Sequence, residues 1–122
     1  MAGKSISGYR NLIVWKEAKK LTILVYQLTD KFPNAEEFGL KSQMRRASVS
    51  VMSQIAEGWL RRSKKDKLHY LEIAEGSLLE LESQGEVIKE VGYWTKDEYH
   101  RFDRQRAKTA YLLYRYKSKI EK

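Results

Sequence analysis

Residues 39–67 read GLKSQMRRASVSVMSQIAEGWLRRSKKDK, and this stretch decides the fold. Its apolar residues recur every three or four positions, as on the buried face of a helix. They are Leu40, Met44, Ala47, Val51 and Ile55. Gly58 is a predicted helix stop, and Ser63 with Asp66 three residues later approximates a capping box. The stretch therefore predicts two helices joined by a short turn.

The same spacing continues on both sides of this stretch. We call such a row of apolar residues along one helix a seam. The seam of the preceding helix consists of Val14, Ala18, Leu21, Val25, Leu28 and Phe32. We expect Asn11 to cap that helix and Pro33 to stop it, because the residue before a proline disfavours the helical region. A third seam consists of Leu71, Ala74, Leu78, Leu81, Gly85 and Ile88 and ends at Gly92. A fourth, weaker one follows a capping box at Thr95 and contains Phe102, Arg106, Thr109, Leu113, Tyr116 and Ile120.

Four helices with short connections predict an all-α fold, an antiparallel up-down-up-down four-helix bundle. With 122 residues, 42% of them hydrophobic and 33% charged, the chain fits one folded domain over residues 1–122. Residues 1–10 are expected to form a flexible N-terminal tail. No apolar run approaches the roughly 20 residues that cross a bilayer, and the first residues do not resemble a signal peptide. We therefore expect a cytoplasmic protein with no membrane partner.

Positive charge is concentrated in the stretch that decides the fold. Residues 39–67 contain eight Lys or Arg against two acids, which is six of the chain's net charge of +8. Such a cluster favours a polyanionic partner. The predicted nucleic-acid-binding residues are Arg45, Arg46, Arg61, Arg62, Lys64, Lys65 and Lys67. The last five flank a helix start, whose free amides and dipole also favour an anion.

Each of these residues also has a plain structural interpretation. The basic turn can be a solvated, solubilising loop, and Arg45 and Arg46 can pair with Glu57 or with acids of the third helix. Trp59 can stack on an unpaired base, although packing over the bundle end is favoured. Glu57 is interpreted as structural rather than as a general base. The third helix is acidic and the fourth basic, so they attract each other within one bundle or across two subunits.

The sequence contains no recognisable catalytic or metal-binding pattern. It has no cysteine and only two histidines, too few for the paired Glu-x-x-His motifs of a di-metal bundle. No Ser-His-acid grouping and no glycine-rich phosphate loop are present. We therefore predict a protein that is not an enzyme and that needs no cofactor and no metal.

Four pieces of the chain resemble the bacterial 23S rRNA intervening sequence proteins. They are NLIVWKEAKKLTILVYQLTDKFP (residues 11–33), GLKSQMRRASVSVMSQIAEGWLRRSKK (39–65), LEIAEGSLLELESQ (71–84) and GYW (92–94). The resemblance implies a helical bundle that assembles as a homo-oligomer, namely a homopentamer, with an RNA-binding role. Related bundle proteins accompany the reverse transcriptases of diversity-generating retroelements. The leading hypothesis is thus an oligomeric RNA-binding module, and the alternative is an accessory subunit of a reverse transcriptase.

Overall fold

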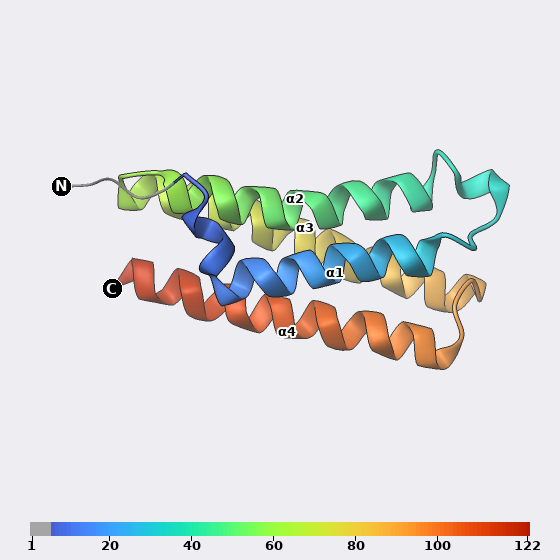
Figure 1. Ribbon diagram of the computed structural model, residues 1–122. Coiled ribbons are helices and arrows are strands. Elements are labelled where there is room, and N and C mark those ends of the chain that lie inside the picture. The colour runs from blue at the N-terminus through green and yellow to red at the C-terminus, as the bar shows by residue number, and fades with distance from the viewer. Residues whose placement is uncertain (1–5) are drawn as a thin grey trace.

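The computed structural model describes residues 6–122, which form four long helices and no strand. The helices are α1 (Ile13–Thr29), α2 (Leu40–Leu60), α3 (Lys64–Val91) and α4 (Lys96–Glu121), and two short 3₁₀-helices, η1 (Gly8–Asn11) and η2 (Asn34–Glu36), precede α1 and α2. Each long helix runs antiparallel to the next (Figure 1), and α1 and α3 each pack against both α2 and α4. The predicted all-α, up-down-up-down four-helix bundle is therefore confirmed.

The core is built from the predicted seams. Every residue of the first and third seams is buried, and in the second seam only Leu40 is partly exposed. The fourth seam is weaker, as predicted: Phe102, Thr109 and Leu113 are buried and the others are partly exposed. Burying one Leu, Ile or Phe side chain contributes about 1.5–3 kcal/mol, so these seams supply the main stabilisation of the bundle.

Three of the predicted helix ends are confirmed in atomic detail. Ser63 begins α3, and its hydroxyl accepts a hydrogen bond from the Asp66 backbone N–H at 3.0 Å. Gly92 ends α3 in the left-handed conformation, with φ of 78°. Thr95 and Glu98 form the predicted capping box at the start of α4. These ends depend on residues within one helical turn, which is why the sequence predicts them.

Two predicted helix ends are wrong. Asn11 does not cap α1: it lies in η1, and Leu12 occupies the capping position without a side-chain hydrogen bond. Gly58 does not stop α2, which continues to Leu60. Gly58 is buried, and a Cβ there would lie 3.2 Å from Cβ of Tyr70 and 3.3 Å from the Lys67 carbonyl oxygen. Its missing side chain lets α3 approach α2 closely rather than breaking the helix.

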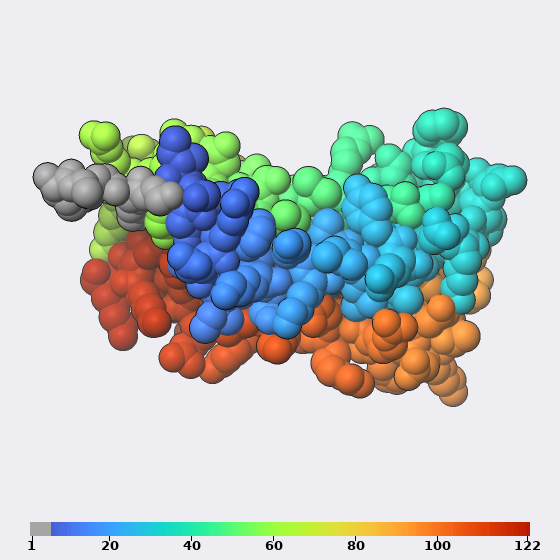
Figure 2. All heavy atoms as spheres, in the orientation of Figure 1, coloured from blue at the N-terminus to red at the C-terminus, as the bar shows by residue number. Residues whose placement is uncertain are grey.

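The N-terminal segment is partly an element of the fold. Of the expected tail, residues 1–5 lie outside the described residues, whereas η1 contacts both α1 and α2. A Cβ on Gly8 would lie 2.6 Å from the Trp59 ring, so η1 rests directly on that indole. Figure 2 shows this segment, in dark blue, on the same face of the molecule as α1. Trp59 therefore packs against the chain, as favoured from the sequence.

Candidate nucleic-acid interface

The α2–α3 turn and the C-terminus of α4 lie at the same end of the bundle (Figure 1). Lys64 joins them, because its Nζ donates a hydrogen bond to the Glu121 carbonyl oxygen at 2.7 Å. A second link joins Lys117, about one turn before Glu121 in α4, to Glu75, about three turns beyond Lys64 in α3: Nζ of Lys117 is 3.0 Å from the Glu75 carboxylate. The exposed cations gathered here, which we call the basic end, are Arg62, Lys64, Lys65, Lys119 and Lys122.

Arg62, in the α2–α3 turn, and Lys65, in the first turn of α3, are the most available of the predicted residues at the basic end. Both are exposed, and neither forms an ion pair with any acid in residues 6–122. The neighbouring acids Asp66 and Glu121 are also exposed and offset part of the charge. Five cations against these two acids still leave a surplus of three positive charges at the basic end. This surplus is what a phosphate backbone would meet.

Arg61 is held within the chain. Its guanidinium is 2.5 Å from the Glu57 carboxylate and lies over the Tyr70 ring, 4.9 Å from the ring centroid. The hydrogen bond to Glu57 raises the pKa of Arg61 above its ordinary value. Glu57 therefore pairs with a cation one turn away on the same chain, which agrees with its interpretation as a structural residue.

Lys67 closes the end of α2. Its Nζ donates hydrogen bonds to the Trp59 carbonyl oxygen at 2.9 Å and to the Gly58 carbonyl oxygen at 3.5 Å. The last carbonyls of a helix have no partner within the helix, so a half-buried ammonium from the next helix satisfies them. A phosphate contact by Lys67 would have to replace these bonds.

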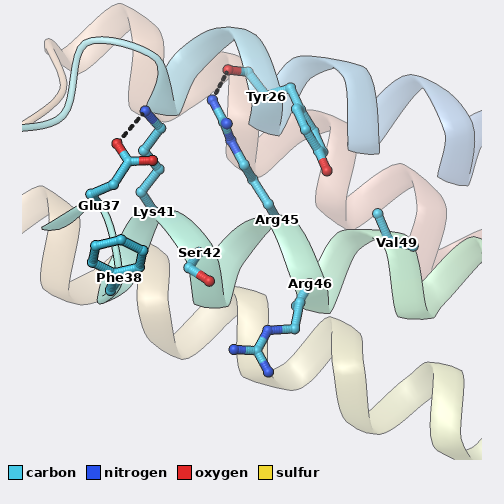
Figure 3. A pocket seen from close by; sticks show the side chains of 8 residues that line it. All are labelled: Tyr26, Glu37, Phe38, Lys41, Ser42, Arg45, Arg46 and Val49. Atoms are coloured by element: carbon cyan, nitrogen blue, oxygen red, sulfur yellow. Dashed lines mark hydrogen bonds and ion pairs between the residues drawn. The ribbon is translucent and has the colours of Figure 1, made fainter.

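Arg45 and Arg46 lie away from the turn and point in different directions (Figure 3). Arg45 reaches to the end of α1, where its guanidinium donates hydrogen bonds to the Thr29 hydroxyl at 3.0 Å and to the Tyr26 carbonyl oxygen at 3.1 Å. Arg46 is exposed, is turned toward α3, and has no ion pair within the described chain. At 1.5 Å per residue, Arg46 and Arg61 are about 22 Å apart along α2. The structure therefore separates Arg45 and Arg46 from the basic end.

The opposite charges of α3 and α4 meet within one chain. In addition to the Lys117–Glu75 pair, Arg106 of α4 lies 3.4 Å from the Glu82 carboxylate of α3. Both cations are partly buried and both carboxylates reach solvent, and ion pairs at a protein surface contribute about 0–1 kcal/mol each. The geometry thus supports the first of the two interpretations, attraction between neighbouring helices of one bundle.

Sequence reasoning did not single out Lys119 and Lys122. They belong to the basic fourth helix, but their proximity to the turn follows only from the antiparallel packing. Within residues 6–122, no three His, Cys, Asp or Glu side chains group in a way that could hold a metal ion. None of the described helices combines the length and apolarity needed to cross a membrane.

The fold and this surface define a class: a small antiparallel four-helix-bundle protein with one strongly basic end. The family described as 23S rRNA-intervening sequence protein matches residues 10–115, and the chain belongs to this family. A crystal structure of a protein of unknown function from the S23 ribosomal protein family of Bacteroides thetaiotaomicron has the same fold. Its TM-score is 0.77 at 20% identity, and the alignment covers 86% of this chain and 98% of that one. No curated protein matches the chain in sequence. The resemblance inferred from the sequence is confirmed.

Proposed function

We propose that the protein is a non-enzymatic module that binds RNA, in association with ribosomal RNA, through the basic end. The observation that carries this proposal is the convergence of exposed cations from two distant parts of the chain. Arg62 lies in the α2–α3 turn and Lys65 in the first turn of α3, while Lys119 and Lys122 lie at the end of α4 and just after it. Cations that contact phosphates fix a protein on a nucleic acid without reading its sequence.

The proposed contact predicts a characteristic dependence of affinity on salt. Each neutralised phosphate releases counterions, and the logarithm of the binding constant falls by roughly 0.7–0.9 per phosphate for each unit of log salt concentration. Five contacts from the basic end would therefore give a slope of about −4. A site that reads bases mainly through hydrogen bonds would give a much smaller slope.

The test is a binding titration with a 23S rRNA hairpin and a scrambled duplex of equal length, across a salt series. The variant Arg62→Gln/Lys65→Gln removes two exposed cations of the basic end. Its matched control, Lys96→Gln/Arg101→Gln, removes two exposed cations at the start of α4, which lies at the other end of the bundle. We expect only the first variant to bind RNA more weakly, and we expect the magnitude of its salt slope to be lower by about 1.5. Equal binding by the two variants would show that the basic end is not the contact.

We also propose that the protein works as a homo-oligomer, with five subunits as the resemblance implies. Exposed apolar side chains support an interface with another chain: Leu79 is 63% exposed, Val91 50% and Val87 46%, all on α3. Light scattering coupled to size exclusion gives the subunit number directly. A monomer at all concentrations would refute the assembly.

The same exposed apolar residues favour the second candidate function, an accessory subunit of a retroelement reverse transcriptase. In this case the apolar side chains of α3 would contact the reverse transcriptase, and the basic end would contact the nucleic-acid template of that enzyme. Co-expression with such an enzyme distinguishes the two candidates. Copurification that Leu79→Asp abolishes would support the accessory role, and RNA binding by the isolated protein would support the first.

A further inference from the structure

A groove between η1 and the first half of α1 combines aromatic rings with cations. It is lined by Tyr9 and Arg10 from η1 and by Trp15, Lys16, Lys19, Lys20 and Ile23 from α1. Its volume is about 780 Å³, which lies within the range of roughly 300–1,000 Å³ that is typical of ligand sites. We call it the N-terminal groove. It is separate from the basic end, and no residue is shared between the two.

The groove is held in shape by the packing of η1. Gly8 rests on the Trp59 ring, where even a methyl group would clash, so the path of η1 across the bundle is closely determined. The next residue, Tyr9, meets Trp15 edge-on, with ring centroids 5.0 Å apart and an interplanar angle of 79°. Trp15, Lys19 and Ile23 follow one another at steps of four residues and so lie along one side of α1. Both walls of the groove are therefore fixed by the fold.

Most of the cations in the groove are uncompensated. Arg10, Lys16 and Lys19 are exposed and form no ion pair with an acid in residues 6–122. Lys20 differs, because its Nζ is 3.1 Å from the Glu17 carboxylate. No acidic residue lines the groove itself. Three free positive charges around two rings create a site for an anion that also carries a flat, stackable group.

The present contacts of the rings show how such a ligand would fit. The Lys19 ammonium lies over the Trp15 ring at 5.8 Å from the centroid, and the Arg10 guanidinium lies over the Tyr9 ring at the same distance. Cations over aromatic faces are held weakly at exposed sites. A stacked base could take the place of the cation on the ring, while the displaced side chain turned to the adjoining phosphate.

The geometry points to the N-terminal groove as a binding site for unpaired nucleotides of single-stranded nucleic acid. The bases of a duplex are stacked on both faces and cannot reach Trp15 or Tyr9, whereas an unpaired base exposes its faces. Aromatic platforms within a basic groove bind single strands with little sequence preference. The groove thus adds a preference for unpaired segments that the charge of the basic end alone cannot provide.

The test compares oligouridylate of about ten nucleotides with a blunt RNA duplex of the same length. Trp15→Leu removes the stacking platform, and Trp15→Phe restores an aromatic ring. We expect Trp15→Leu to weaken oligouridylate binding about 5- to 140-fold, since stacking on one base is worth roughly 1–3 kcal/mol. We expect Trp15→Phe to retain most of the affinity, and duplex binding to change little in either variant.

A second variant keeps the test informative if Trp15→Leu does not fold. Lys16→Gln/Lys19→Gln removes two exposed cations of the groove, and Lys96→Gln/Arg101→Gln again serves as its matched control. We expect the groove variant to lower the salt slope for oligouridylate by about 1.4, because each phosphate on a single strand contributes roughly 0.7. An unchanged slope would overturn the proposal.

A spectroscopic readout separates stacking from simple charge attraction. In a ¹⁵N-labelled sample the indole N–H signal of Trp15, assigned by its loss in Trp15→Phe, should shift with oligouridylate but not with oligoglutamate. Binding of both polyanions without an indole shift would overturn the proposal and reveal only a charged surface. The basic-end variant Arg62→Gln/Lys65→Gln should leave the indole shift intact. The two proposals therefore fail independently.

Discussion

Two glycines of α3 offer a controlled test of how tightly this bundle is packed. A Cβ added at Gly76 would meet no described atom of another segment within 4 Å. A Cβ added at Gly85 would lie 2.7 Å from one atom of the Phe102 ring and 3.5 Å from two others. The same substitution in the same helix thus meets open space at one position and a buried ring at the other.

The expected magnitudes follow from two opposing effects. Replacing a helix glycine by alanine stabilises the folded state by roughly 0.5–1 kcal/mol, whereas overpacking a core costs typically 1–3 kcal/mol. Gly76→Ala should therefore raise the free energy of unfolding by about 0.5–1 kcal/mol. Gly85→Ala should lower it by roughly 0.5–2 kcal/mol, and the difference between the two variants measures the overpacking alone.

Phe102 has little room in which to yield. It is 1% exposed, and its ring centroid is 5.0 Å from that of Trp94. Trp94 is itself fixed, because its indole N–H donates a hydrogen bond to the Leu28 carbonyl oxygen at 2.6 Å. A shift of Phe102 would thus disturb the contact between α4 and the end of α1.

Urea denaturation followed by far-UV circular dichroism, at one protein concentration for all variants, is the appropriate assay. The double variant Gly85→Ala/Phe102→Leu provides the internal check, since a smaller side chain at position 102 makes room for the methyl group. Its destabilisation should be smaller than the sum of the two single changes. If Gly85→Ala proves as stable as Gly76→Ala, the close contact between α3 and α4 is refuted.

Three further predictions concern the core, a buried acid and a helix end. Leu78→Asp should abolish cooperative folding, because Leu78 is 4% exposed and an unpaired buried charge costs several kcal/mol. The control Leu79→Asp changes a neighbour that is 63% exposed, and this variant should fold normally. Equal urea denaturation curves for the two variants would contradict the burial pattern. The pKa of Glu17 is lowered from 4.5, chiefly by the Gln105 hydrogen bond, so its stabilising effect should be full above pH 4.5 and lost as the pH falls through the folded-state pKa. The difference in stability between wild type and Glu17→Gln should therefore shrink in acid, and a constant difference would refute this. Gly92→Ala should lower the free energy of unfolding by about 1 kcal/mol, since φ of 78° disfavours a side chain; an unchanged melting curve would count against that conformation.

Apolar side chains are also exposed on the outer faces of α3 and α4, where they do not pack into the core. The buried residues of α3 are spaced as the sequence seam predicts, while Leu79, Val87 and Val91 stand in solvent between its glutamates. Tyr111 and Tyr114 of α4 are likewise 56% and 63% exposed. Exposed apolar side chains in this number are the feature that oligomerisation or a protein partner would explain.

Local patterns in the sequence were sufficient for the helices and most of their ends. A seam repeats every three or four residues, and the caps at Ser63, Thr95 and Gly92 involve groups within four residues of one another. Interactions of such short range are visible in a linear chain. The resemblance noted in the sequence rests on the same local signals, since the quoted segments lie within residues 11–94, and the family match extends beyond them to residue 115.

Contacts between distant segments were decided only by the tertiary structure. Gly58 resembles a helix stop in the sequence, but its role depends on Tyr70 and Lys67 of the next helix. The predicted cations of residues 39–67 appeared equivalent in the sequence, yet Arg61, Lys67 and Arg45 bind groups of their own fold. Arg62 and Lys65 form no ion pair within residues 6–122.

The sequence by itself thus determined the number and periodicity of the helices and the caps at Ser63, Gly92 and Thr95, because these depend on neighbours within one or two turns. Only the antiparallel packing decided which charges remain available and where they gather. It brought the C-terminal lysines to the α2–α3 turn and laid Tyr9 of η1 against Trp15 of α1. The basic end and the N-terminal groove both exist because the buried core fixes the helices and η1 in place. Their side chains are thereby held together although they come from different elements of the fold.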